Sequence, residues 1–418
     1  SLKTLNAGAD GNNTAVGYIA GVFLTTGVNN TLIGSLAGDA LTEGGNNTAL
    51  GFQALSADTL GSRNTAIGYN TLLVQNFTSA TNSYNVAMGH DAGRAITTGY
   101  QNVLIGGLAG DAITTGYYNV AVGTSALGGN TTGTSNVAIG ERSLIANTTA
   151  ANNTALGYTS LTANTTGALN TALGSQALLS NTTASNNTAV GSASLYYNTT
   201  GASNTGLGRQ ALFNNTTADS NTAVGYKALL DNTTGVRNSA FGDNSLANNT
   251  TANNNNAFGY LSLYTNTTGT QNVAIGTEAL TANTTGSDHV AIGYQALLAN
   301  TTANINTAVG YQALLANTTG WGNLALGPNA LDANTTGLKN IAVGGFSLSA
   351  STTASNNTAV GYNALLANTT ASGNVAVGLS ALTANTTGTQ NVAVGTTTLT
   401  NCTTGANNTG IGHQSLNA

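Results

Sequence analysis

Apolar and polar residues recur along this chain with a period of seventeen residues. A short segment of the form Asn-Thr/Val-Ala-apolar-Gly starts each unit, and 24 such units run from Asn13 to Asn408. The units stay in phase except for one four-residue insertion, which we place at about 76–84. A fixed period of this length is typical of repeat architectures, in which each unit buries its apolar side chains against its neighbours. We therefore predict a single repeat domain over 13–418, preceded by an incomplete coil at 1–12.

The pattern within one unit predicts its local structure. With positions numbered 1 to 17 from Asn306, the unit reads NTAVGYQALLANTTGWG. Residue types alternate along positions 2 to 4, and a glycine follows at position 5. This pattern predicts a strand of three to four residues. Positions 8 to 11 predict a second strand. Position 5 is Gly in all 24 units, which indicates a corner with positive φ. The Asn-Thr-Thr-Gly at positions 12 to 15 predicts a turn that closes the coil.

Each position also has an expected direction. Position 4 is always apolar and position 9 is Leu in 20 units, so we expect both to point inward. Position 3 is Ala in 20 units, and this uniform smallness predicts that Ala308 and Ala325 contact the backbone of a second copy. The Asn residues at positions 1 and 12 are expected to form amide ladders along the stack. Positions 6, 7 and 10 vary freely and are expected to face solvent or a partner.

These features together predict an all-β fold, a parallel β-roll or β-solenoid of about 24 coils with seventeen residues each. Two large apolar side chains per coil give a small core against an ordering entropy of ~1 to 2 kcal/mol per residue. We therefore expect several copies to pack around a shared axis. The coils over 13–118 differ from the rest, and we expect them to have a different cross-section. In four of them a glycine replaces the Leu at position 9 and an apolar residue follows three positions later: Gly21 and Leu24, Gly38 and Leu41, Gly93 and Ile96, Gly110 and Ile113.

The composition of the chain argues against a nucleic-acid partner and a membrane span. Charged residues make up 5% of the chain, against about 25% in ordinary soluble proteins, and the net charge is −5. The eight Lys and Arg residues are scattered, so no basic stripe indicates a nucleic-acid partner. No stretch approaches the ~20 apolar residues that span a bilayer. The low charge and the Thr- and Asn-rich surface favour an extracellular, cell-surface or virion location.

Several units are similar to known repeats. The segments 119–123, 136–140 and 272–276 read Asn-Val-Ala-Val/Ile-Gly and resemble the head repeats of trimeric autotransporter adhesins. The fuller unit is similar to the seventeen-residue NTAxGYQAL..NTTG repeats of bacterial and phage tail-fibre-type proteins, and this resemblance covers residues 13–416. The resemblance implies a left-handed parallel β-roll, assembly as a homotrimer, and a role in surface display or adhesion.

The sequence shows no set of residues spaced as in a known type of catalytic site. Asp39 and Asp111 share position 10, but four coils separate them by about 19 Å, whereas paired-carboxylate glycosidases need ~5 to 9.5 Å. His90, His289 and His413 form no recognisable triad, and His289 replaces an Asn of the position-1 ladder. The single cysteine, Cys402, excludes an intrachain disulfide framework. We therefore predict no enzymatic activity, no cofactor and no metal site.

Two sets of residues are candidates for contacts with partners. Exposed aromatic side chains could stack on the sugar rings of a glycan or receptor, or simply shield a coil edge: Tyr226, Tyr260, Tyr294, Tyr311, Tyr362 and Trp321. Leu2, Leu5 and Leu416 could join copies head to tail into a filament, with residues 1–6 adding a strand to an open end. The leading hypothesis is a structural fibre or adhesin. The alternative is an ice-binding or carbohydrate-binding solenoid, although the two adjacent Thr at positions 13 and 14 lack the alternate-Thr pattern of an ice-binding face.

Overall fold

The computed structural model describes residues 11–417 of the chain, which divides into two compact units, Ser1–Arg209 and Gln210–Ala418. Residues 1–10 and 418, including Leu2 and Leu5, lie outside the described part. The fold is an all-β parallel β-solenoid of about 23 turns with 17 residues per coil, and the described residues contain no helix. The repeat therefore predicts the fold class correctly. The single repeat domain over 13–418 stays a prediction.

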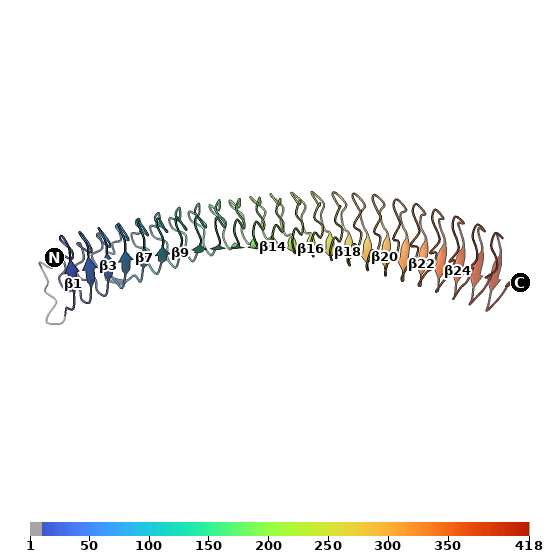
Figure 1. The fold of residues 1–418 in the computed structure, drawn as a ribbon, viewed down its shortest axis with the longest axis horizontal. Helices are drawn as coiled ribbons and strands as arrows, with labels where there is room; N and C mark the ends of the chain where they lie inside the picture. The colour runs from blue at the N-terminus through green and yellow to red at the C-terminus, as the bar shows by residue number, and fades with distance from the viewer. Residues whose placement is uncertain (1–10, 418) are drawn as a thin grey trace. The chain divides into compact units, whose positions relative to one another are not determined.

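Each coil contributes one short strand, made by positions 2 to 4 of the repeat, to a parallel sheet that follows one side of the coils (Figure 1). In the first unit these strands are β1 (Thr14–Val16), β2 (Thr31–Ile33), β3 (Thr48–Leu50), β5 (Thr65–Ile67), β7 (Val86–Met88), β8 (Val103–Ile105), β9 (Val120–Val122), β10 (Val137–Ile139), β11 (Thr154–Leu156), β12 (Thr171–Leu173), β13 (Thr188–Val190) and β14 (Thr205–Leu207). In the second unit they are β15 (Thr222–Val224), β16 (Ser239–Phe241), β17 (Asn256–Phe258), β18 (Val273–Ile275), β19 (Val290–Ile292), β20 (Thr307–Val309), β21 (Leu324–Leu326), β22 (Ile341–Val343), β23 (Thr358–Val360), β24 (Val375–Val377), β25 (Val392–Val394) and β26 (Thr409–Ile411). Two further strands, β4 (Gly61–Ser62) and β6 (Thr81–Asn82), pair in parallel next to the insertion.

The glycine at position 5 forms the corner that ends each strand. At Gly310 the backbone has φ +138°, and the other position-5 glycines lie between +110° and +140°. A Cβ placed on Gly310 would lie 2.5 Å from the carbonyl oxygen of Gly327 in the next coil. The predicted corner is confirmed, because both the backbone conformation and the distance to the next coil exclude a side chain there.

The second predicted strand, at positions 8 to 11, is wrong. In coil 306–322 this segment is a turn in which Gln312 and Leu314 both have φ of 53°. Ala313 and Leu314, at positions 8 and 9, are both fully buried. Neighbouring residues of an extended strand point to opposite faces, so a strand would expose one of the two. The left-handed backbone on either side of Ala313 allows both side chains to point inward.

The inward residue of each strand is position 3, so our expectation for position 4 is wrong. Ala308 and Ala325 are fully buried inside their own coils, whereas Leu326 at position 4 is 44% exposed. The predicted contact of Ala308 and Ala325 with a second copy is therefore also wrong, because these side chains fill the interior of the coil that carries them. The pleat of a three-residue strand then requires positions 2 and 4 to face outward together.

Amide ladders complete the interior, as the Asn pattern predicts. At position 1 the Asn136 backbone N–H donates to Oδ1 of Asn119 at 3.1 Å, and its side-chain Nδ2 donates to the carbonyl of Ala150 at 2.9 Å. At position 12 the Nδ2 of Asn181 donates to Oδ1 of Asn164 at 2.9 Å. These hydrogen bonds satisfy polar groups that are buried among small apolar residues, which lets a coil with few large side chains stay closed.

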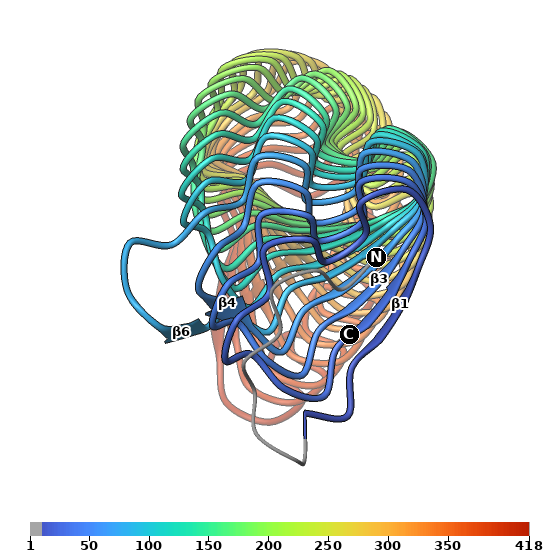
Figure 2. The same cartoon turned by 90° about the vertical axis from the view of Figure 1, so that its left-hand side faces the viewer.

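The first coils redistribute their core volume, as we expect from their sequence. Leu41, at position 12, is fully buried and takes the place of a ladder Asn. A Cβ on Gly38 would lie 2.8 Å from the side chains of both Leu32 and Leu41, so the missing Leu at position 9 is replaced by bulk from two neighbours. The insertion also lies in this part of the chain, and Figure 2 shows the segment leading into β6 looping out beyond the neighbouring coils. These differences are confined to the first unit.

Candidate interaction surfaces

In each unit, the outward side chains at positions 2 and 4 form a surface that we call the sheet face. Position 4 is Val, Ile, Leu, Met or Phe in all 24 units, and neither position carries a charged residue in any unit. Charged residues occur instead in the turns, for example Lys227 and Glu278 at position 7 and Asp332 at position 10. The sheet face therefore combines an apolar row at position 4 with an uncharged row at position 2, where the residue is Thr in half of the units.

Many side chains on this face are large, apolar and exposed. In the first unit they are Val16, Ile33, Leu50, Met88, Ile105, Leu156, Leu173 and Leu207, and in the second Phe258, Ile275, Leu326, Ile341, Val394 and Ile411. Phe241 and Phe258 stack along the face with their ring centroids 4.8 Å apart. Strands at ~4.8 Å spacing and roughly 7 Å of width give the strip of β15–β26 on the order of 400 Å² in projection. The largest apolar patch on a typical monomer is ~300 to 600 Å² and is often functional, and the strip of this unit lies in that range.

The predicted position-6 tyrosines form a second, more broken surface. All five are exposed, from 38% at Tyr226 to 52% at Tyr311 and Tyr362. Tyr294 and Tyr311 stack on each other, with centroids 5.5 Å apart and an interplanar angle of 16°. Tyr362 meets Phe346 edge to face at 5.8 Å. Because these rings contact neighbouring coils, shielding of the coil edge accounts for much of their arrangement.

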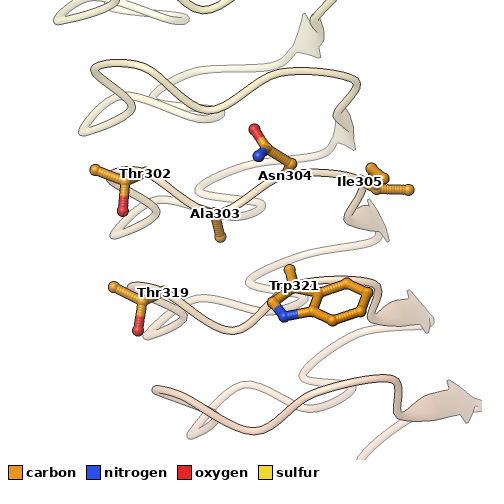
Figure 3. Close-up of a pocket in the computed structure, with 6 residues that line it drawn as sticks. All are labelled: Thr302, Ala303, Asn304, Ile305, Thr319 and Trp321. Carbon is orange, nitrogen blue, oxygen red and sulfur yellow. The ribbon is translucent and has the colours of Figure 1, made fainter.

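Trp321 lies apart from that surface, at position 16 of its coil, beside a groove of about 300 Å³ (Figure 3). Its indole is 42% exposed, and Nζ of Lys339 lies 4.8 Å from the ring centroid. The groove is lined by Thr302, Ala303, Asn304, Ile305, Thr319 and Trp321. The structure thus places Trp321, one of the aromatic residues singled out from the sequence, in a concave surface with polar neighbours.

The sequence reasoning missed an aromatic cluster in the first unit. Tyr100 and Tyr117 occupy position 16 of adjacent coils and stack with centroids 4.9 Å apart, and Tyr118 meets both of them edge to face. Loss of solvent and the neighbouring phenols raise the pKa of Tyr100 above its usual value. The sequence shows Tyr at position 16 of two adjacent units, but the prediction considered only the tyrosines at position 6 and Trp321.

The titratable side chains do not converge on a site. Over residues 11–417, no group of three or more His, Cys, Asp or Glu side chains is placed to hold a metal ion. Asp58 is buried near the insertion and accepts hydrogen bonds from the Gly61 N–H at 2.9 Å and from Nε2 of Gln75 at 2.8 Å, while burial raises its pKa. Its hydrogen bonds to chain groups identify Asp58 as part of the coil interior.

The remaining predicted contact residues lie near the ends of the chain. Leu416 is 56% exposed in the last described coil, and Cys402 is a half-buried free thiol that occupies a position-12 ladder site. Since Leu2 and Leu5 fall outside the described residues, the head-to-tail contact stays a prediction.

Comparison with known proteins assigns no family to the chain. No protein-family model matches it, and no curated protein matches it. In the part of the chain that the structure describes, no helix is long and apolar enough to cross a membrane.

Proposed function

We propose that the protein is a structural fibre or adhesin segment, displayed on a cell or virion surface, that assembles with copies of itself through the sheet face. The observation that carries this proposal is the absence of charge from positions 2 and 4 in all 24 units, although both positions point away from the coil interior. The outward apolar side chains at position 4 are stabilised when another surface removes them from water.

Copies of the same chain fit this face better than an unrelated partner does. The residues at position 4 vary in size, from Val309 to the stacked Phe241 and Phe258. When parallel copies surround a common axis in register, each coil of one copy contacts the same coil of the next copy. The position-4 residues that face each other are then the same residue in both copies. The strip of the second unit alone offers on the order of 400 Å² in projection, against the ~800 Å² that each partner of a standard interface buries. A homotrimer is the arrangement that the resemblance to adhesin heads implies.

Ice binding is a second candidate, which one observation favours. Four consecutive strands of the first unit, β11 to β14, present Thr154, Thr171, Thr188 and Thr205 outward at position 2, beside apolar residues at position 4. The outward Thr row that we did not find at positions 13 and 14 thus exists on the sheet face. Ice binding needs this face open to water, whereas assembly covers it, so a gap between melting and freezing temperatures in solutions of the protein would favour ice binding.

The molecular mass in solution tests the assembly proposal. We expect a sedimentation-equilibrium mass of a multiple of the 41.3 kDa chain, and that of a trimer in the simplest case. The double variant Ile275→Lys with Leu326→Lys should sediment as a monomer with an unchanged circular dichroism spectrum, because the ammonium groups resist burial between copies. Tyr294→Lys, in a turn, is the matched control and should keep the parent mass. A monomeric parent at micromolar concentration, or an assembled double variant, would contradict the proposal.

A further inference from the structure

We propose that the groove beside Trp321 binds a neutral pyranose ring of a glycan. This inference deepens the attachment role in the proposed function and rests on that role only for its biological setting. The groove lies in the turns of the second unit, away from the strand positions that form the sheet face, so assembly and sugar binding use different residues.

The indole provides a flat platform that the neighbouring coils hold in place. Lys339 belongs to the following coil and sets its ammonium group over the ring, 4.8 Å from the centroid. Asn304 and Ile305 belong to the preceding coil and lie across the groove from the indole (Figure 3). The ring is therefore flanked by Lys339 on one side and by the open groove on the other. The C–H face of a pyranose packs against such an exposed aromatic surface, because both are apolar and flat.

A side chain is also missing next to the groove. Gly322 follows Trp321 at position 17, directly one coil after Ile305, and it has φ +70°. A Cβ on Gly322 would find only Lys339 nearby, at 3.5 Å from its Cγ, so no atom of the preceding coil lies within 4 Å of that point. Position 17 carries a side chain in most other units, and in the one other unit with Gly there, at Gly373, the preceding residue is Ser372. The combination of indole, glycine and apolar wall occurs once in the repeat.

The polar groups around the groove match the hydroxyls of a sugar. The Oδ1 atom of Asn304 accepts a hydrogen bond from the Ser287 N–H at 2.8 Å, which orients the amide and leaves its Nδ2 as a donor. The side chains of Thr302 and Thr319 stand one above the other at the other end of the groove, and each hydroxyl both donates and accepts (Figure 3).

Size and charge narrow the ligand further. No charged residue lines the groove, so a uronic or sialic acid finds no counter-charge among its walls and meets a cation only at Lys339, beside the indole. Its volume of about 300 Å³ is at the small end of ligand sites, which suits one sugar ring with part of the next. We therefore assign a neutral oligosaccharide as the ligand class.

Trp321 is the only tryptophan in the chain, so its fluorescence reports on the groove directly. The assembled protein should be titrated with maltotriose, cellotriose, chitotriose and galactobiose, and with trigalacturonic acid as the charged comparator. We expect a saturable change in emission with at least one neutral sugar and none with trigalacturonic acid. The absence of a saturable change with every neutral sugar, or tighter binding of trigalacturonic acid, would overturn the proposal.

Variants then locate the binding in the groove, with saturation-transfer NMR as a readout that does not depend on the tryptophan. Trp321→Ala should weaken binding of the responding sugar by about tenfold or more, which corresponds to ~1.4 kcal/mol. Tyr311→Ala removes a ring that is 52% exposed and stacked on Tyr294, and it should leave the affinity unchanged. Binding by Trp321→Ala at the parent affinity would reject the site. Both variants should keep the sedimentation mass of the parent, so failure of the sugar site is distinguishable from failure of the assembly proposal.

Discussion

The inward and outward rows of the same strand follow opposite rules. Position 3, as at Ala308, is fixed in size, and it becomes Leu only where a glycine makes room for it, as Leu32 does beside Gly38. Position 4 accepts Val, Met and Phe but never a charge. The size of the residue at position 3 is thus limited by the volume that each coil encloses. At position 4 only the polarity of the residue is limited. A restriction on polarity at position 4 is what the assembly that we propose through the sheet face requires.

The corner glycine should give the largest effect on the interior. Gly310→Val places a β-branched residue at φ +138° with its Cβ against the Gly327 carbonyl, so we expect a loss of about 4 kcal/mol or more in the free energy of unfolding. Denaturant unfolding followed by circular dichroism measures it. The neighbouring Tyr311→Val, in an exposed turn position, should change the stability little. Equal stability of both variants would disprove the corner argument.

A substitution that is too large for position 3 can be compensated by a second substitution in the same coil. Ala308→Leu overfills a closed coil and should cost about 1 to 3 kcal/mol. Adding Leu314→Gly in the same coil reproduces the pairing of Leu32 with Gly38, so the double variant should be more stable than the sum of the single changes predicts. Additive losses in this double-mutant cycle would show that the two positions do not share one volume. Ala308→Leu should also leave the assembled mass unchanged, because this side chain does not reach the sheet face.

His289 makes the interior sensitive to pH. Its Nδ1 accepts the Asn306 N–H at 3.2 Å and its Nε2 lies 2.6 Å from the Ala303 carbonyl, so the buried ring is held neutral with its proton on Nε2. Burial lowers its pKa below the usual value, while Asp288 opposes this shift. The unfolded chain therefore binds a proton below pH ~6.5 that the folded chain does not, and stability should fall as the pH drops from there.

Thermal unfolding at neutral pH and near pH 5 measures this effect, which we expect as a lower unfolding temperature at the acidic pH. His289→Asn restores the residue found at position 1 in the other units and should remove this part of the pH dependence. The same slope in the parent and in His289→Asn would assign the acid sensitivity to other groups.

An interrupted ladder should give the smallest effect, and in the stabilising direction. Ser351 stands where most coils carry Asn at position 12, and the buried Oδ1 of Asn334 and Oγ of Ser351 have no hydrogen-bond partner among the described residues. Ser351→Asn should donate to Asn334 and raise the free energy of unfolding by about 1 kcal/mol. Thr353→Asn, at an exposed turn position, is the control and should be neutral. A destabilised Ser351→Asn would mean that this coil has no room for the amide.

The sequence predicts the coil, its corner and its ladders. The recurrence of Gly at position 5, as at Gly310, and of Asn at positions 1 and 12 each has one physical explanation. It does not decide which side of a three-residue strand faces inward. Hydrophobicity pointed to Val309 rather than Ala308, since the usual rule assumes that the interior holds the larger apolar residues. The left-handed Leu314 also escaped prediction, because a bulky residue rarely adopts positive φ. The groove at Trp321 is lined by residues of adjacent coils, such as Ile305 and Thr319, and only the stacking register brings them together.

The most direct test of the sheet face as a contact between copies is the reactivity of cysteines placed on and off it. Leu326→Cys on the face and Tyr294→Cys in a turn replace residues that are both 44% exposed in the single chain, and Cys402→Ser removes the native thiol from each variant. We predict that a maleimide labels Tyr294→Cys rapidly and Leu326→Cys slowly in the assembled protein, and that dilution to the monomer makes the two rates similar. Equal labelling rates in the assembled protein would show that the sheet face is open and would contradict the account.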